Sequence, residues 1–420
     1  MNENLVLGVD LGSSYIKGVI GSRNDDGKVS IKAVHAQKSK GIEKGLIVDT
    51  VALRESFFPF VRQLLNKAGL TQVVVKKFYV FNSYRKMKSV TTDVIRNFED
   101  QEITQSLLDE MREESLKNPT SNSYVNFESI LQAYIVNDGA PTLSVEGKYA
   151  TSLKARYTLI IGNKEGESNL YKAISCGNKD VAENACSHFL SFASLGEVVL
   201  TKKERVKGVL LLDFGGETTT LAFYSQMSLR SLNVFDFGGN DITRKLMEEF
   251  SFSKEQAEQL KIKCGVKPRV GEIAMEINGV KTVVNLAQVS ECIGKVVDSQ
   301  LFQIELFCQD NNIIPKIMRI VLVGGGAKSV GISEKMQTIF GKEVVGGYPT
   351  CLSENLSSLG KKECQKYLDY SKLCAILNSH DENCIEELPE PTPQKKGKSK
   401  FSLGALVDAL DNATNNIWGK

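Results

Sequence analysis

VLGVDLGSSYIKGVI, from Val6 to Ile20, has the pattern of two strands joined by a tight turn. The glycine of the turn lets the backbone approach a phosphate, and the serine hydroxyl and N–H groups can hold phosphate oxygens. The aspartate before the turn can hold a hydrated Mg2+, and the lysine after it can neutralise the phosphate. The candidate site residues are therefore Asp10, Gly12, Ser13, Ser14 and Lys17.

The chain contains a second turn of the same kind, although single Asp-x-Gly-Ser turns also occur in ordinary hairpins. Residues 209–224 read VLLLDFGGETTTLAFY, so an aspartate and two glycines again follow an apolar run. A third glycine turn, in IVLVGGGAKSVGI at 320–332, follows an apolar strand and leads into a helix-like segment, which suits contact with a nucleotide. These turns add the candidates Asp213, Gly215, Gly216, Thr218, Gly324, Gly325 and Gly326.

Two Asp-Gly hairpins and a late glycine turn resemble the superfamily of actin, Hsp70 and the sugar kinases. In that superfamily the hairpins bind the phosphates from opposite sides and the late turn binds the adenosine. The resemblance implies an α/β, two-lobed actin-like (ribonuclease H-like) ATPase fold with ATP and Mg2+ as cofactors. It also implies that Asp10 and Asp213 hold the Mg2+ through water.

Composition excludes several classes of protein. A chain of 420 residues with 42% apolar and 24% charged residues is globular, with room for about two to four domains. Its 52 basic and 50 acidic residues nearly balance, so the chain has no overall positive charge that would attract nucleic acid, and no nucleic-acid partner is expected. The chain shows neither a signal sequence nor a membrane-spanning run, which predicts a cytoplasmic protein. Nine scattered cysteines and three histidines argue against disulfides, a metal cluster and a hydrolase triad.

Hydrophobic periodicity predicts a mixed α/β chain with a small α+β insertion after the first lobe's strands. The expected elements are strands within 28–49, a helix over 50–69, a strand over 73–81, a helix over 103–116, and strands over 129–137, 142–146 and 149–161. Within 265–310 we expect a hairpin over 272–285, turning at Asn278 and Gly279, and a long helix with one apolar face.

An insertion at this point resembles FtsA, a family of bacterial division proteins related to actin. Further stretches resemble that family in order and spacing over nearly the whole chain: GLIVDT at 45–50, FASLGEVVL at 192–200, FGGNDITRKL at 237–246 and AEQLK at 257–261. Taken alone, the last two also suit an ordinary glycine turn and a solvated helix face. The resemblance adds Gly238, Gly239, Glu258 and Lys261 to the nucleotide site, the last two beside the ribose.

The resemblance also implies the division of the chain. The expected parts are a first lobe over 1–82, 164–200 and 345–385, an inserted subdomain over 83–163, a second lobe over 201–240 and 311–344, a subdomain over 241–310, a flexible linker over 386–400 and an amphipathic helix over 401–420.

In FtsA the subdomain corresponding to 241–310 binds the C-terminal tail of the tubulin-like division protein. The basic run over 261–269 would suit that acidic tail, and a solvated surface is the alternative. The resemblance further implies head-to-tail polymers of the chain itself, and contacts of other division proteins with 83–163.

The last 20 residues, FSLGALVDALDNATNNIWGK, have one apolar and one polar helical face and follow a lysine cluster at 395–400. This pattern predicts a helix that lies in the interface of the anionic inner membrane, with docking onto a partner protein as the alternative. One tail binds weakly, so a polymer that presents many tails would bind firmly. The membrane-facing residues are Leu403, Leu406, Val407, Leu410, Ile417 and Trp418.

The chain departs from the family pattern at several positions. Glu217 replaces a glycine in the second phosphate turn, and its carboxylate would repel phosphate unless it turns away or meets the metal. Ser191 and Phe192 stand where related polymers have a water-positioning Glu-Pro pair. We therefore expect ATP to be bound but cleaved slowly or not at all. Other departures are Tyr15, Thr220 and the stretch APTLSVEGKYA in the insertion.

The resemblance predicts a cell division protein at the cytoplasmic face of the bacterial inner membrane. There it would anchor the tubulin-like division ring and help recruit later division proteins. One alternative is a small-molecule kinase of the superfamily, which would need a general-base aspartate in the cleft. The other is a pilus-assembly scaffold of the same fold, which would not need an amphipathic tail.

Overall fold

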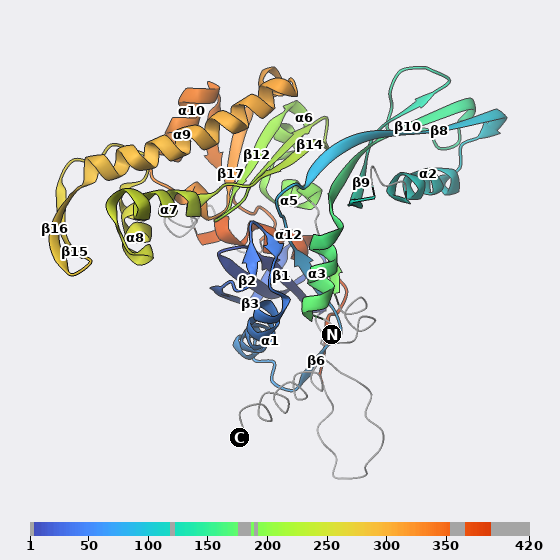
Figure 1. The fold of residues 1–420 in the computed structure, drawn as a ribbon. Coiled ribbons are helices and arrows are strands. Elements are labelled where there is room, and N and C mark those ends of the chain that lie inside the picture. Colours follow the sequence, from blue (N-terminus) through green and yellow to red (C-terminus); the bar gives the residue numbers. More distant parts are fainter. Residues whose placement is uncertain (1–3, 118–121, 175–185, 189–191, 353–365, 388–420) are drawn as a thin grey trace, which may run out of the picture.

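The computed structural model describes residues 4–117, 122–174, 186–188, 192–352 and 366–387. Two lobes lie one above the other in Figure 1, and an arm extends from each side of the upper lobe. This arrangement confirms the predicted two-lobed α/β architecture. The predicted C-terminal helix over 401–420 lies outside the described residues.

The first lobe is built on a five-stranded sheet in the order β11-β7-β1-β2-β3. Every residue of β1 is buried, because α1 and α12 cover the sheet. The Asp49 side chain caps α1 by accepting hydrogen bonds from two backbone N–H groups of its first turn. The elements of this lobe are β1 (Val6–Leu11), β2 (Tyr15–Arg23), β3 (Val29–Lys38), β4 (Ile42–Glu43), β5 (Leu46–Ile47), α1 (Thr50–Lys67), β6 (Val73–Val75), β7 (Phe78–Phe81), α3 (Lys164–Ile174), β11 (Cys186–His188), α5 (Phe192–Val199), the 3-10 helix η4 (Lys366–Tyr370), α12 (Ser371–Ser379) and β19 (Ile385–Glu387).

The second lobe contributes β18-β17-β12-β13-β14 to an eight-stranded sheet. Along β12, Leu210 and Leu212 face one hydrophobic core while Leu211 faces the other, so the strand is buried on both sides. The elements are α6 (Lys202–Lys207), β12 (Val209–Phe214), β13 (Thr219–Ser225), β14 (Ser228–Phe235), η1 (Ile314–Lys316), β17 (Arg319–Val323), η2 (Gly325–Lys328), α10 (Ile332–Phe340) and β18 (Glu343–Gly346).

The arm at the left of Figure 1 comprises two short helices, a hairpin and a long helix that returns to the lobe. The expected hairpin, with its turn at Asn278 and Gly279, and the expected long apolar-faced helix are both present. The elements are α7 (Gly239–Phe250), α8 (Lys254–Cys264), β15 (Glu272–Ile277), β16 (Val280–Asn285) and α9 (Leu286–Asp310). Among the helices that the structure describes, none has the length and apolar character needed to span a bilayer.

The arm at the right of Figure 1 is the insertion, with its own hydrophobic core. It contains β8 (Lys88–Glu102), α2 (Gln105–Lys117), β9 (Tyr124–Val136) and β10 (Tyr149–Asn163). The three strands extend the sheet of the second lobe in the order β14-β8-β10-β9, through one bridge between Asn233 and Lys88. Side chains reinforce this junction: the Leu232 N–H donates to Ser89 Oγ at 2.8 Å, and the Gln132 amide donates to the Leu229 carbonyl oxygen at 3.0 Å.

Two expectations about elements are wrong, and one strand was not predicted. The sequence reading missed β8, because Val90, Val94 and Phe98 recur at every fourth residue and do not alternate strictly. The predicted strand over 142–146 is only an isolated bridge between Thr142 and Tyr134. The predicted strand over 73–81 is divided, because β6 pairs with β19 and β7 pairs with β1 and β11.

Candidate functional site

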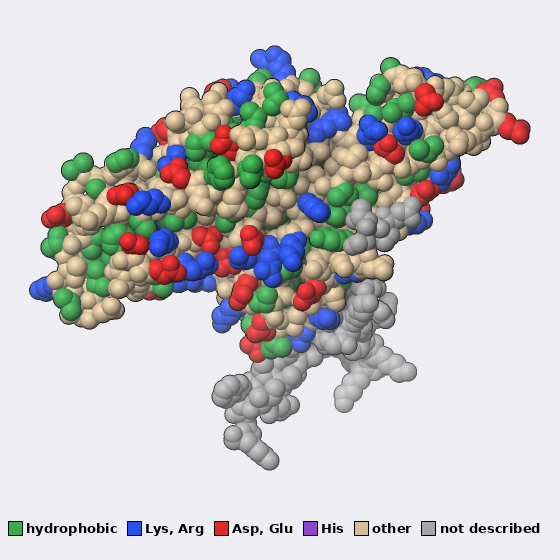
Figure 2. Space-filling view, turned by 45° about the horizontal axis from the view of Figure 1, so that its top comes forward, with side chains coloured by type: hydrophobic (Ala, Val, Ile, Leu, Met, Phe, Trp, Pro, Cys, Tyr) green, Lys and Arg blue, Asp and Glu red, His purple; other side chains and the backbone are tan. Residues whose placement is uncertain are grey.

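The two predicted phosphate turns meet where the lobes face each other. A Cβ added to Gly216 would lie 2.0 Å from the Oγ of Ser14 and 3.0 Å from its Cβ, so the second turn comes this close to the first because Gly216 has no side chain. The Ser14 hydroxyl also contacts Asn240 Oδ1 at 3.4 Å. Figure 2 shows basic and acidic side chains gathered next to one another where the lobes meet. The structure therefore brings together the two turns that lie about 200 residues apart in the sequence.

Each turn is held by backbone hydrogen bonds. In the first turn, the Gly45 N–H donates to the Oγ of Ser13 at 2.8 Å, and the Ser39 hydroxyl donates to the Gly12 carbonyl oxygen. In the second turn, the Gly215 N–H donates to the Thr218 carbonyl oxygen at 2.9 Å. The backbone of both turns is thus fixed before any ligand arrives, as a phosphate-binding loop requires.

Asp10 and Asp213 are the second-to-last residues of β1 and β12, and both are close to fully buried, at 6% and 5% exposed. A residue that sequence reasoning missed, Lys372 at the start of α12, lies beside both. Its Nζ is 2.7 Å from Asp213 Oδ2 and 3.7 Å from Asp10 Oδ1. Burial alone would lower the pKa of Lys372, but the two carboxylates outweigh it and hold the pKa above its ordinary value. The ammonium is therefore charged at neutral pH.

The predicted Mg2+ does not fit these residues. Magnesium needs oxygen ligands in near-octahedral geometry and keeps several waters, whereas an ammonium already lies between the two carboxylates. The other oxygen of Asp213 lies against Gly324, where an added Cβ would come within 2.3 Å of it.

Lys17 does not stand free to meet a phosphate. Its ammonium donates to the Asp369 carbonyl oxygen at 3.1 Å and lies 4.0 Å from that residue's carboxylate. Lys328, which follows the late glycine turn, forms an ion pair with the same carboxylate. Asp369, in η4, thus holds two lysines that enter the site from different lobes. A role of Lys17 at a phosphate stays a prediction.

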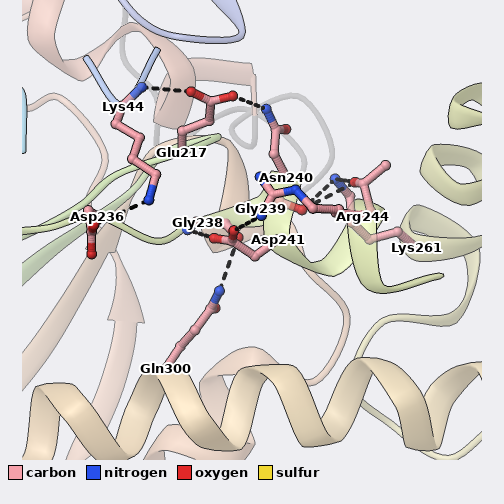
Figure 3. A network of polar contacts seen from close by, with 11 residues as sticks. Lys44, Glu217, Asp236, Gly238, Gly239, Asn240, Asp241, Arg244, Lys261 and Gln300 are labelled. Atoms are coloured by element: carbon pink, nitrogen blue, oxygen red, sulfur yellow. Dashed lines mark hydrogen bonds and ion pairs between the residues drawn. The ribbon is translucent and has the colours of Figure 1, made fainter. Parts of the chain in front are cut away.

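The segment FGGN packs directly on the second turn. The Gly239 N–H donates to the Gly215 carbonyl oxygen at 3.1 Å, and the Asn240 N–H donates to the Gly216 carbonyl oxygen. The Gln300 amide of α9 donates to the Gly238 carbonyl oxygen at 3.1 Å (Figure 3). The FGGN segment is therefore hydrogen-bonded to the backbone of the second turn.

Glu217 turns away from the hairpin and bridges the lobes (Figure 3). Its Oε2 accepts from the backbone N–H of Lys44 at 2.7 Å, and its Oε1 accepts from the Asn240 amide at 3.2 Å. The Lys44 ammonium also lies 3.2 Å from Asp236 Oδ2. Glu217, which stands where the family pattern has glycine, thus links the second lobe to the first through its bond with Lys44.

This bridge gives a testable prediction. In a Glu217→Ala variant the Lys44 N–H loses its acceptor, so its hydrogen exchange should become about tenfold faster, as expected for losing one hydrogen bond. Hydrogen-exchange mass spectrometry of the peptide that contains Lys44 measures this. Glu217→Gln keeps an oxygen acceptor and is the matched control, with exchange close to that of the unaltered chain. Equal acceleration in both variants would contradict the bridge.

Glu258 and Lys261 lie together at the base of α7. The Lys261 ammonium donates to Glu258 Oε1 at 2.8 Å, to Thr243 Oγ1 at 2.9 Å and to the Gly239 carbonyl oxygen at 3.1 Å. The structure thus connects both residues to the FGGN segment beside the second turn. Their predicted contact with a ribose remains a prediction.

The late glycine turn lies against the end of β12. Gly324 has a positive φ of 83°, and its N–H donates to the Leu368 carbonyl oxygen at 3.2 Å. A Cβ on Gly326 would come within 2.7 Å of the Phe214 side chain. All three predicted glycine turns therefore converge on one region, and their binding of a nucleotide stays a prediction.

Of the two residues that replace the Glu-Pro pair, the structure describes Phe192, whose side chain has no polar group to position water. Phe192 begins α5, is buried, and packs edge-on against Phe81 with ring centroids 5.2 Å apart. Ser191 lies outside the described residues. The expectation of weak or absent ATPase activity stays a prediction.

The sequence offered little to single out Lys372. The one available signal is a lysine in the first turn of an otherwise apolar helix, where a cation is disfavoured by the helix dipole. Lys44, Lys328 and Asp369 carried no signal, because their partners come from distant parts of the chain.

Known proteins are similar to this chain over most of its length. The family model described as cell division protein FtsA matches residues 210–363. Cell division protein FtsA of Neisseria meningitidis is 26% identical over 355 residues, covering 81% of this chain and 83% of the relative. Cell division protein FtsA of Borreliella burgdorferi is 24% identical over 416 residues, covering 96% of this chain and 97% of the relative.

Among solved structures, the PilM-PilN type IV pilus biogenesis complex has a TM-score of 0.60 at 15% identity, covering 89% of this chain and 97% of that chain. At this identity the likeness shows the fold alone. The predicted actin-like fold is confirmed.

Proposed function

Since this chain is related to the FtsA cell division proteins, which confirms the predicted resemblance, we propose that it joins the bacterial division ring to the membrane. The observation that carries its role in cell division is the FtsA likeness, which extends over 96% of the chain in one relative. The finer parts of the proposal concern a nucleotide, a membrane and partner proteins.

The proposed ligand of the three glycine turns is ATP. The turns converge on one region, and a Cβ on Gly216 of the second turn would meet the Ser14 side chain of the first. Their backbones are held by hydrogen bonds, so the turns keep their shape without a ligand. These features support binding of a polyphosphate by backbone N–H groups.

The proposed partner of the arm over 241–310 is the acidic tail of the tubulin-like division protein. Exposed apolar residues lie on this arm next to the exposed basic residues Lys263 and Arg269, and Figure 2 shows hydrophobic side chains at that end of the molecule. Two members of the predicted basic run are engaged elsewhere, because Lys261 pairs with Glu258 and Lys267 pairs with Glu334. The exposed apolar residues of this surface are Ile262, Val270, Val280 and Val283.

The proposed membrane anchor is the tail over 401–420, placed on the cytoplasmic face of the inner membrane at the division site. Polymers of the chain would present many such tails, and contacts through 83–163 would recruit other division proteins. The apolar stripe and the lysines before it support this role.

Vesicle co-sedimentation of the full chain tests the anchor. A Leu410→Asp variant places a charge on the apolar stripe, and we expect it to lose at least tenfold in binding to anionic vesicles, because burying one charge outweighs the gain from one leucine. Asn412→Asp adds the same charge to the polar face and is the matched control, with at most a few-fold effect. Equal binding by both variants would contradict a membrane-inserted stripe and would favour docking onto a protein.

A further inference from the structure

We propose that Lys372 takes the place of a divalent metal ion in this cleft, so that a nucleotide is bound with the lysine ammonium as its cation and without Mg2+. The inference deepens the proposed nucleotide binding and rests on it. It concerns the same site, but it assigns the central positive charge to the chain itself.

The first argument is position. The Lys372 Nζ lies 2.7 Å from Asp213 Oδ2 and 3.7 Å from Asp10 Oδ1. The two carboxylates that were predicted to hold Mg2+ therefore converge on an ammonium. An ammonium has three donor hydrogens, and if each of the two carboxylates accepts one, a third remains. Donor capacity remains for a phosphate oxygen.

The second argument is that Lys372 is held in place. The five residues that follow it in α12 are all buried, so the start of this helix is fixed against the first lobe. Its own side chain is 16% exposed, and its ammonium lies 5.3 Å from the centre of the buried Phe81 ring. A cation in the first turn of a helix is disfavoured by the helix dipole, so the aspartates account for its position.

The third argument is charge balance. Lys17 and Lys328 both pair with Asp369, and Lys372 lies beside Asp10 and Asp213. Three lysines thus face three aspartates at the base of the cleft. A divalent cation added between the last two aspartates would meet the ammonium at close range and would be repelled by it.

The first experiment measures Mn2+ binding to the full chain without nucleotide, by electron paramagnetic resonance of free Mn2+. We expect the Lys372→Ala variant to bind about one equivalent more Mn2+ than the unaltered chain. The double variant Lys372→Ala with Asp213→Asn should lose this additional Mn2+ site. If the unaltered chain already binds one Mn2+ that Asp213→Asn removes, the proposal is overturned.

The second experiment measures ATP affinity by calorimetry in EDTA and in Mg2+. We expect the two dissociation constants of the unaltered chain to agree within about threefold, and Lys372→Ala to lose at least about tenfold in EDTA and to recover in Mg2+. Lys372→Arg keeps the charge and should remain insensitive to EDTA. A tenfold or greater loss in EDTA for the unaltered chain would overturn the proposal without any variant.

The two experiments separate this inference from the proposed function. If the unaltered chain binds ATP in neither buffer, the proposed nucleotide binding fails, and so does the role of Lys372 as its cation. The Mn2+ titration then still decides whether Lys372 occupies the place of a metal. Circular dichroism of each variant establishes that it is folded.

Discussion

Replacement of Lys372 by alanine is expected to lower the free energy of unfolding by about 3 to 5 kcal/mol, the range for breaking a buried ion pair. The substitution leaves the carboxylates of Asp10 and Asp213 buried beside each other with no counterion, and each is less than a tenth exposed. Urea unfolding followed by circular dichroism, with ATP and metals absent, measures the loss from the shift of the midpoint.

A surface ion pair of the same length is the matched control. The Lys335 ammonium lies 2.7 Å from Asp298, whose side chain is 56% exposed, so Lys335→Ala should cost less than about 1 kcal/mol. A loss for Lys372→Ala as small as that for Lys335→Ala would mean that the two aspartates do not depend on this lysine.

Replacement of Gly324 by alanine is the second change with a large expected effect, of about 3 kcal/mol or more in the free energy of unfolding. Its backbone, at φ 83° and ψ 172°, lies in a region that only glycine occupies readily. The new Cβ would also lie 2.3 Å from Asp213 Oδ1 and 2.6 Å from the Phe214 carbonyl oxygen. Because Asp213 would have to move, ATP affinity should fall together with stability.

Gly341 provides a control for a positive φ without a close contact. It also has a positive φ, 61°, but a Cβ there would meet nothing within 4 Å. Gly341→Ala should therefore cost only about 1 kcal/mol. Thermal and urea unfolding of both variants compare the two costs, and equal costs would show that the contact with Asp213 adds nothing.

The sequence predicted the parts of the site that are local in the chain. Each phosphate turn could be identified because an apolar strand, an aspartate and a glycine follow one another within a few residues. The structure places Gly216 beside Ser14, and the resemblance to the actin superfamily had implied that the two turns face one site. The long helix and the hairpin of the arm over 241–310 could also be predicted, because their hydrophobic periodicity is regular.

Contacts between distant parts of the chain could not be predicted in this way. Lys372 reaches Asp10 across more than 360 residues, and Glu217 reaches Lys44 across 173. No local pattern distinguishes such a lysine or glutamate from a solvated one, because the partner depends on how the lobes are assembled. Strand β8 was missed for a local reason. On its core-facing side, the polar residues Thr92 and Arg96 alternate with apolar residues, so the apolar residues do not recur at every second position.

The insertion has a mechanical consequence. It is continuous in the chain with the first lobe, yet its sheet is joined to the second lobe at Lys88 and Asn233 and is tied there by Ser89 and Gln132. When one lobe rotates against the other, the insertion must either break these bonds or travel as a lever arm with the second lobe. A rotation of the lobes would then displace the far tip of this arm further than its base, because the strands extend away from the junction.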